Sequence, residues 1–168
     1  AHPTGCAAHV HEQINYVAAQ GAQADNAFKN ILVLGCSGGY GLASRVVAGF
    51  GYRANTLGVS FEKAPTENKT ASAGWYNNRA YERAAKAAGL YARTLDGDAF
   101  SDDLREQAAQ VIRQDMGQID LVVYSLASPV RQHPRTGELH RSSIKPLGQV
   151  LNIKTCLLYT SDAADDCR

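Results

Sequence analysis

The sequence predicts an α/β protein built on a doubly wound parallel sheet. Short apolar runs without polar alternation, typical of strands buried on both faces, recur four times along its 168 residues. Between them lie segments of helix length in which apolar residues recur every three or four positions. Strands that alternate with helical crossovers of this length pair in parallel, and their helices cover both faces of the sheet.

The predicted elements begin with a helix. Residues 2–6 are expected to be extended, residues 10–20 to form a short helix that Gly21 ends, and residues 22–29 to form a polar turn. Strands are expected at 30–34, 56–61, 90–95 and 119–125, and the helices between them at 39–50, 75–88 and 101–116. The last helix opens with SDDL, a serine cap followed by acids in the first turn. Residues 128–136 are expected to be loop, and the periodicity fades beyond residue 144, before the sheet is complete.

The composition argues against several classes of function. The net charge is +1 and no cluster of five or more Lys or Arg occurs, so nucleic acid is not expected as a partner. No apolar run reaches the roughly 18 residues that cross a bilayer, and the N-terminus lacks a signal-peptide pattern, so we expect a cytoplasmic protein without a membrane partner. The four cysteines form no CxxC pair, and His9 and His11 lack further ligands at useful spacing, so no metal site is expected.

Glycines follow the first predicted strand, in the stretch ILVLGCSGGYGLASR. In a doubly wound sheet, the turn from the first strand into its helix is where a dinucleotide pyrophosphate meets backbone amides. Gly35 would make the sharp turn, Gly39 would let the phosphate approach, and Gly41 would let the helix pack closely. A Walker loop is excluded because no GK[ST] follows. A tight turn that binds no ligand is the alternative interpretation.

The ends of the other three strands agree with a dinucleotide site. Glu62 follows the second strand, where a carboxylate accepts hydrogen bonds from the adenosine ribose and repels a 2′-phosphate, which indicates NAD rather than NADP. The adjacent Lys63 argues the other way, since a cation could bind that phosphate, and a solvated Glu–Lys pair that binds no ligand is the alternative interpretation. Asp98 and Ala99 follow the third strand, at the adenine, and the small residues of SLAS follow the fourth, at the nicotinamide ribose. For these last two ends, ordinary loop residues are the alternative.

Seven segments, in this order and at these separations, resemble one family of enzymes. They are AHPTGC, VLGCSGGYGLASR, TLGVSFEK, AGWYNNRA, GLYARTLDGDAFSDD, MGQIDLVVYSLASPVR and TGELHRSSIKPLG. They resemble the single-chain NADH-dependent trans-2-enoyl-CoA and enoyl-acyl-carrier-protein reductases of the FabV class. The resemblance runs from residue 1 to about residue 148, and it is carried by GWYN, GDAFS and VVYSLASP, which a generic Rossmann-type domain lacks.

The resemblance implies a Rossmann-type domain that binds NADH, from which a hydride goes to the β carbon of a trans-2-enoyl thioester while a proton reaches the α carbon. The substrate would be an enoyl-CoA or an enoyl-acyl-carrier protein, and the intact enzyme would be a monomer in fatty acid metabolism. The family's NAD contacts carry over onto Gly35, Cys36, Ser37, Gly38, Gly39, Tyr40, Phe61, Glu62, Asp98, Ala99, Leu126 and Ala127.

The resemblance also implies a catalytic tyrosine, which polarises the thioester carbonyl, and a lysine that follows after eight residues. None of the eight tyrosines has a lysine at that spacing, so we expect the catalytic pair to lie beyond the end of this chain. Residues 1–150 would then be an incomplete, truncated NAD-binding domain that is inactive alone. Residues 151–168 do not resemble the family and are expected not to belong to the domain.

Two other functions stay open at this point. One is another NAD(P)-dependent oxidoreductase of the short-chain dehydrogenase type, against which the strings GWYN and GDAFS argue. The other is a dinucleotide-binding module without catalysis.

Overall fold

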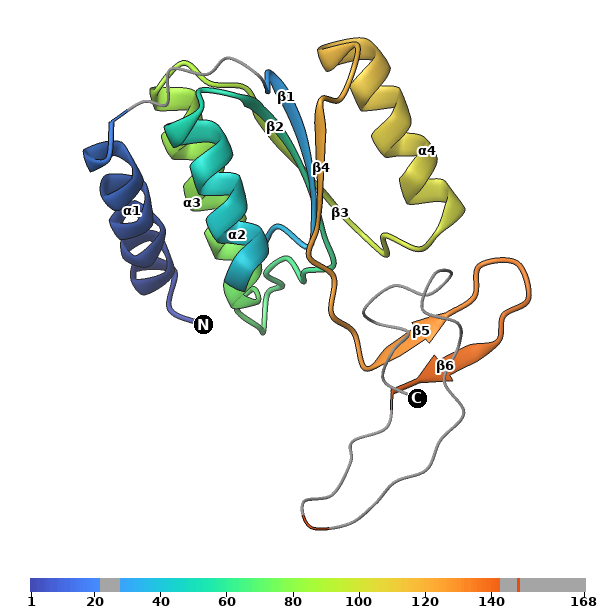
Figure 1. Ribbon diagram of the computed structural model, residues 1–168. Helices are drawn as coiled ribbons and strands as arrows, with labels where there is room; N and C mark the ends of the chain where they lie inside the picture. The colour runs from blue at the N-terminus through green and yellow to red at the C-terminus, as the bar shows by residue number, and fades with distance from the viewer. Residues whose placement is uncertain (22–27, 143–147, 149–168) are drawn as a thin grey trace.

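The structure, a computed structural model, describes residues 1–21, 28–142 and 148. Four parallel strands form one sheet with the order β3-β2-β1-β4 (Figure 1). The strands are β1 (Asn30–Leu34), β2 (Asn55–Ser60), β3 (Ala92–Asp96) and β4 (Leu121–Tyr124), and the helices are α1 (Pro3–Ala19), α2 (Gly39–Val46), α3 (Ala73–Ala87) and α4 (Asp102–Val111). This arrangement confirms the predicted α/β class.

The order of the strands places the helices on opposite faces of the sheet. From β1 the chain passes through α2 to β2 and through α3 to β3, and then returns through α4 to β4 on the other side of β1. Accordingly, α1, α2 and α3 cover one face and α4 covers the other (Figure 1). The direction of winding reverses between β1 and β4. Ligands of such sheets bind at this reversal, outside the carboxyl ends of the strands.

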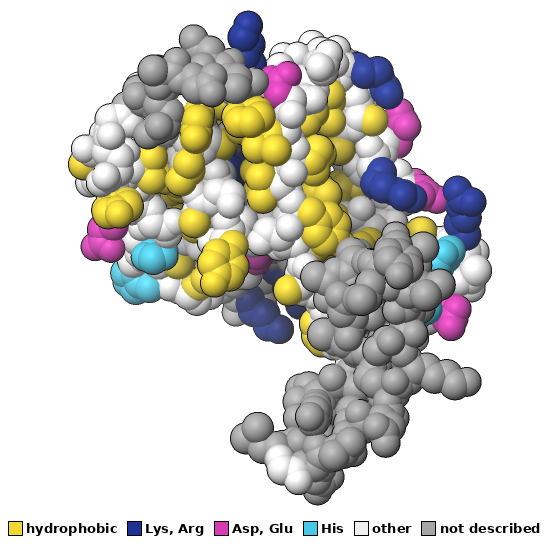
Figure 2. All heavy atoms as spheres, in the orientation of Figure 1, with side chains coloured by type: hydrophobic (Ala, Val, Ile, Leu, Met, Phe, Trp, Pro, Cys, Tyr) yellow, Lys and Arg dark blue, Asp and Glu magenta, His cyan; other side chains and the backbone are white. Residues whose placement is uncertain are grey.

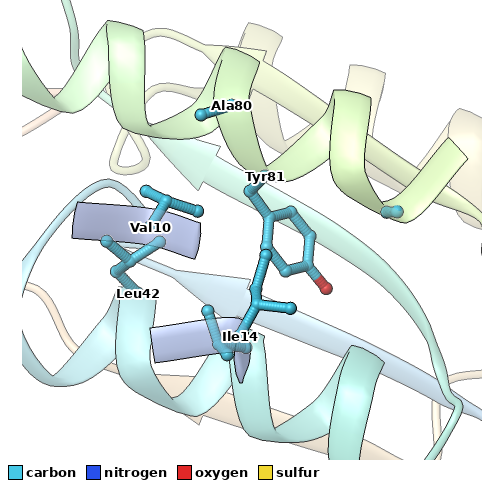
Figure 3. Close-up of a cluster of buried hydrophobic side chains, with 7 residues drawn as sticks. Val10, Ile14, Leu42, Ala80 and Tyr81 are labelled. Atoms are coloured by element: carbon cyan, nitrogen blue, oxygen red, sulfur yellow. The ribbon is translucent and has the colours of Figure 1, made fainter. Parts of the chain in front are cut away.

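The three helices on one face share a hydrophobic core. Val10 and Ile14 of α1 meet Leu42 of α2, and all three pack with Ala80 and Tyr81 of α3 (Figure 3). Each of these five side chains is at most 8% exposed. Burial of a large aliphatic or aromatic side chain contributes about 1.5–3 kcal/mol, so hydrophobic packing holds α1 to the domain. On the opposite face, a smaller cluster joins β2 to α4.

Most predicted boundaries agree with the structure. β1 occupies the predicted residues, and the ends of β2, β3 and β4 differ from prediction by one or two residues. α2 and α4 continue into the π-helical turns η1 (Val47–Gly51) and η2 (Ile112–Met116), which complete the predicted helical ranges. Ser101 caps α4 as expected, since its hydroxyl accepts a hydrogen bond from the Leu104 amide at 3.2 Å. Of the predicted turn 22–29, residues 22–27 lie outside the described residues.

The first difference from prediction lies at the start of α1. Residues 2–6 were expected to be extended, but the helix begins at Pro3, and Nδ1 of His2 accepts a hydrogen bond from the Gly5 amide at 3.4 Å. Proline is favourable at the first helical position because the amide that it lacks would have no partner there. The prediction was wrong because it placed the start of the helix at the first apolar residue of the helical spacing, Val10, whereas Pro3 and the His2 cap begin it one to two turns earlier.

The second difference follows β4. Residues 128–136 were expected to be loop, but β5 (Val130–Gln132) and β6 (Leu139–Arg141) pair as a short antiparallel hairpin. The prediction of a loop was wrong because strands of three residues carry too little apolar alternation to be recognised. The hairpin lies beyond the carboxyl ends of the sheet strands (Figure 1).

Candidate functional site

A pocket of about 580 Å³ opens where the four strands of the sheet end. Its walls come from the segments that follow β1, β2, β3 and β4, together with the start of α2 and strand β5. The pocket therefore lies at the reversal of winding, where ligands of this fold bind. Eleven of the twelve residues predicted to contact NAD line it: Gly35, Ser37, Gly38, Gly39, Tyr40, Phe61, Glu62, Asp98, Ala99, Leu126 and Ala127.

Close packing requires two glycines of the first turn. At Gly35 the φ angle is 82°, and a Cβ atom would lie 2.1 Å from the carbonyl oxygen of Ser125, just after β4. At Gly41 a Cβ atom would lie 1.9 Å from the carbonyl oxygen of Gly35. Backbone atoms leave no room for a side chain at either position. Gly35 thus makes the turn and Gly41 lets α2 begin directly against it, in the way that the sequence indicates.

Gly38 and Gly39 face open space instead. A Cβ atom at either position would meet nothing within 4 Å. Gly38 is the N-cap of α2 and has no side chain to cap it, and the Leu42 amide donates the first helical hydrogen bond to the Gly38 carbonyl at 3.1 Å. The amides of residues 39–41 therefore have no partner inside the helix. Such amides, at the positive end of a helix dipole, can bind phosphate groups.

Two aromatic side chains lie at the rim of the pocket. Tyr40 is 89% exposed and Phe61 is 81% exposed, and both line the pocket. They come from different elements, since Tyr40 opens α2 and Phe61 follows β2. Their rings are accessible to a flat heterocycle, which aromatic side chains bind by stacking or by edge contact.

Cys36 is the one predicted NAD contact that does not line the pocket. Its side chain is fully buried, its Sγ donates to Oδ1 of Asn78 at 3.5 Å, and its amide donates to the carbonyl of Val59 at 3.2 Å. Burial raises the pKa of the thiol, although the nearby Arg45 guanidinium opposes that shift. Both the thiol and the amide already have partners inside the protein. The geometry therefore gives the predicted Cys36 contact no support, because the side chain points into the core.

Glu62 is held by hydroxyl groups from two other elements. The Ser37 hydroxyl, in the turn after β1, donates to Oε1 of Glu62 at 2.6 Å. The Ser72 hydroxyl, at the N-cap of α3, donates to Oε2. Each carboxylate oxygen can accept a further hydrogen bond, so Glu62 can still accept from a ligand in the pocket. Lys63 has an exposed side chain and, within the described ranges, is not among the residues that line this pocket.

Asp98 shapes the loop that follows β3. Its Oδ1 accepts a hydrogen bond from the Phe100 amide at 2.9 Å, and its carbonyl accepts from the Ser101 hydroxyl at 2.8 Å. Local hydrogen bonds of this kind fix a turn. The alternative interpretation, that Asp98 is an ordinary loop residue, therefore accounts for part of its role. Its place in the pocket wall is also compatible with the predicted adenine contact. Leu126 and Ala127 follow β4 and line the pocket at the other edge of the sheet from β3.

Eight further residues line the pocket. Ser125 and Ser128 belong to the SLAS segment that was expected at the nicotinamide ribose, and the other six were not predicted: Ser60, Gly97, Phe100, Val130, Arg131 and Gln132. The first three of these six directly adjoin predicted positions after β2 and β3. The last three form β5, which sequence analysis missed. The guanidinium of Arg131 lies 5.0 Å from the centre of the Phe100 ring, and this contact connects the hairpin to the loop after β3.

In the part of the chain that the structure describes, no three His, Cys, Asp or Glu side chains gather where they could hold a metal ion. Within the same ranges, no helix is both long and apolar enough to span a membrane.

The sheet, its winding and the position of the pocket define a Rossmann-like α/β domain. Two family models match the chain: the NAD(P)H binding domain of trans-2-enoyl-CoA reductase over residues 1–67, and the trans-2-enoyl-CoA reductase catalytic region over residues 69–165. The chain therefore belongs to the trans-2-enoyl-CoA reductase family. The second match continues past residue 148, where the resemblance was expected to fade. Residues 149–168 lie outside the described residues, so the division between 1–150 and 151–168 stays a prediction.

Individual relatives agree with this assignment. The chain is 58% identical over 155 residues to the enoyl-[acyl-carrier-protein] reductase [NADH] of Pseudoalteromonas atlantica, a match that covers 92% of this chain and 39% of the relative. It is 55% identical to the enzyme of the same name from Edwardsiella ictaluri, over 98% of this chain and 39% of the relative. The chain thus spans about 39% of the length of these curated relatives.

A solved structure matches both the fold and the sequence. Treponema denticola trans-2-enoyl-CoA reductase in complex with NAD superposes with a TM-score of 0.82 and 52% sequence identity, over 89% of this chain and 38% of that one.

Proposed function

We propose that this chain binds NADH and takes part in the NADH-dependent reduction of the carbon–carbon double bond of trans-2-enoyl thioesters. One observation carries the proposal: eleven residues, chosen from sequence as NAD contacts, line one pocket at the strand ends of a chain that is 52% identical to a reductase solved with NAD. This likeness favours the enoyl reductase over a generic short-chain dehydrogenase and over a module without catalysis.

The pocket fits a dinucleotide. Its volume of about 580 Å³ is in the usual range for ligand sites, and a Cβ atom at Gly38 or Gly39 would meet no other part of the fold within 4 Å. The first-turn amides of α2 would hold the pyrophosphate. The carboxylate of Glu62 would accept hydrogen bonds from the adenosine ribose, and Leu126 and Ala127 would lie beside the nicotinamide ribose.

When bound, the reduced nicotinamide supplies the hydride for the β carbon of the thioester. The residues of this chain bind and orient the cofactor, and the tyrosine and lysine that would polarise the carbonyl are expected outside these 168 residues. We extend the proposal to an enoyl-CoA or enoyl-acyl-carrier-protein substrate, a role in fatty acid metabolism, a cytoplasmic location and a monomeric intact enzyme. Sedimentation analysis of the intact enzyme tests the last of these: a dimer would contradict it.

NADH binding is tested by titrating the 168-residue chain with NADH and following NADH fluorescence. We expect saturable binding that Gly38→Glu abolishes, because a carboxylate on the open turn would repel the pyrophosphate. The Gly38 backbone is extended, with φ −164°, and accepts any residue. Gln110→Glu is the matched control, since it adds the same charge to an exposed position of α4 that does not line this pocket. Equal loss of binding in both variants would contradict this site.

Catalysis is tested in a chimaera. The residues of the Pseudoalteromonas atlantica relative that match this chain are replaced by this chain, and NADH oxidation is measured with crotonyl-CoA. We expect turnover from the chimaera and none from the 168-residue chain alone. A folded chimaera that binds NADH but never turns over, beside an active parent enzyme, would refute the proposed reaction.

A further inference from the structure

We propose that Ser37, Ser72 and Gly74 make Glu62 selective for NADH over NADPH, by clamping its carboxylate in one position against the start of α3. This inference rests on the proposed function and deepens it. The acidic residue alone was predicted from sequence, whereas the clamp consists of residues from two other segments, the turn after β1 and the start of α3, that only the structure brings to Glu62.

The two oxygens of the Glu62 carboxylate are bound by different elements. Ser37 donates to Oε1 at 2.6 Å from the turn after β1, and Ser72 donates to Oε2 from the start of α3. Ser72 is itself fixed, because its hydroxyl also accepts from the Lys63 amide at 3.1 Å and its own amide donates to the Lys63 carbonyl at 3.0 Å. A carboxylate held at both oxygens cannot rotate without breaking a charge-assisted hydrogen bond.

Ser72 makes this bond instead of its ordinary one. Serine at an N-cap normally accepts a hydrogen bond from an amide of the first turn, and Ser101 does so at α4, with the Leu104 amide at 3.2 Å. Ser72 occupies the N-cap of α3 but makes no such bond to the helix. Its hydroxyl is directed to Glu62.

Gly74 provides the space in which the carboxylate lies. A Cβ atom at Gly74 would be 2.1 Å from Oε1 of Glu62, 2.4 Å from its Cδ and 2.7 Å from Cβ of Ser37. Glycine is unfavourable inside a helix, and here the carboxylate occupies the place that a side chain would take. The positive end of the α3 dipole favours the negative charge there.

The clamp affects a 2′-phosphate more than a ribose hydroxyl. A free glutamate could turn toward solvent, where water and salt would screen its charge from the phosphate. A clamped carboxylate keeps its charge in the pocket wall, and its remaining lone pairs can still accept hydrogen bonds from hydroxyl groups. Among the described residues that line the pocket, Glu62 and Asp98 are acidic and Arg131 alone is basic. Lys63, the cation next to Glu62, does not line the pocket within those ranges.

The test measures the ratio of the dissociation constants for NADPH and NADH by titration of the 168-residue chain. In Gly74→Ala the new methyl group pushes aside the carboxylate of Glu62 and Cβ of Ser37, both of which belong to the clamp. In Ser72→Ala one hydrogen bond to Glu62 is lost. We expect each variant to lower the ratio by about tenfold, equivalent to about 1.4 kcal/mol. Ser37→Ala should act in the same direction.

Two matched controls separate selectivity from folding. Gly5→Ala changes a glycine in the first turn of α1, where the nearest heavy atom to a new Cβ is 4.0 Å away, and Ser101→Ala removes a true N-cap. We expect Ser101→Ala to lower thermal stability without changing the ratio, and Gly5→Ala to raise thermal stability slightly without changing the ratio. If Gly74→Ala does not fold, Ser72→Ala carries the test, because it removes atoms and creates no clash.

The outcomes distinguish the two proposals. If the folded wild-type chain binds neither NADH nor NADPH, the proposed function is refuted and the clamp is refuted with it. If wild type binds NADH selectively and the ratio is unchanged in both Ser72→Ala and Gly74→Ala, the clamp is refuted and the function stands. A ratio that falls equally in Ser72→Ala and Ser101→Ala would also overturn the clamp.

Discussion

Arg45 offers the strongest test of how the domain is held together. It lies on α2 with no exposed surface. Its Nε donates to Oγ1 of Thr56 at 3.3 Å, its Nη1 to Oγ1 of Thr94 at 2.9 Å, and its Nη2 to the carbonyl of Arg93 at 2.8 Å. The guanidinium also lies 4.5 Å from the centre of the Tyr81 ring. These partners are neutral acceptors and an aromatic face, so Arg45 connects α2 to β2, β3 and α3.

We expect Arg45→Met to lower the free energy of unfolding by about 3–5 kcal/mol. Methionine fills much of the volume but donates nothing, so the Thr94 hydroxyl and the Arg93 carbonyl each lose a donor, at about 1–3 kcal/mol apiece. Loss of the cation–π contact adds up to about 2 kcal/mol in a desolvated site. Relief of the buried charge offsets part of this loss. The net effect is still a loss of stability, because the Thr94 hydroxyl and the Arg93 carbonyl remain without their donor.

The assay is urea unfolding followed by far-ultraviolet circular dichroism, with the melting temperature as a second readout. A loss of about 4 kcal/mol corresponds to a fall in Tm on the order of 10 °C for a domain of this size. The matched control is Arg113→Met. Arg113 pairs with Glu106 at 2.7 Å, but the two side chains are 63% and 73% exposed, and exposed pairs contribute about 0–1 kcal/mol. Equal effects of the two substitutions would refute the reasoning, because burial would then not decide the contribution of the arginine.

Two further predictions concern pH. Desolvation and the hydrogen bond to Asp115 raise the pKa of Tyr91 to about 12, so the contribution of Tyr91 to stability is present below pH 10 and lost as pH rises toward 12. The stability difference between wild type and Tyr91→Phe should therefore be smaller in urea titrations at pH 11 than at pH 9, and a constant difference would contradict this. Hydrogen bonds from the Asn30 and Lys29 amides, at 2.9 and 2.8 Å, lower the pKa of Asp120, so the contribution of Asp120 to stability is present at neutral pH and lost as pH falls below about 4. The greater stability of wild type over Asp120→Asn should therefore disappear in acid, and a difference that persists at pH 2 would show that the charge is not responsible.

Much of the sheet could be predicted because its strands lie in short, largely apolar runs. The run at β1 (Asn30–Leu34) is bounded by a polar segment and by Gly35, so its limits were predicted correctly. The expected burial on both faces holds for most of β2 only, because β4 lies at an edge of the sheet with most of its residues exposed, and hydrophobic side chains are visible between α2 and α4 (Figure 2). The start of α1 and the β5–β6 hairpin were missed because their sequences carry no such clear pattern. Pro3 is compatible with a helix start as well as with a break, and three-residue strands carry no reliable period.

Gly58 shows a kind of constraint that sequence patterns do not reveal. It lies inside β2, where glycine is unfavourable. A Cβ atom there would be 2.5 Å from Sγ of Cys36 and 2.7 Å from Nη1 of Arg45. The glycine is explained by a side chain of α2 that crosses the strand, and this contact follows from tertiary packing alone.

The sequence by itself determined which strand ends meet at the pocket, because parallel strands bring all their carboxyl ends to one edge of the sheet. It did not reveal β5, which also lines the pocket. Only the tertiary structure decided which side chains face that pocket. Of two adjacent residues, Ser37 lies in the pocket wall and Cys36 lies in the core, since the turn at Gly35 sets the direction of each. The tertiary structure also decided that Glu62 is held in place, because the hydroxyl of Ser72 reaches it only when α3 packs beside the first turn.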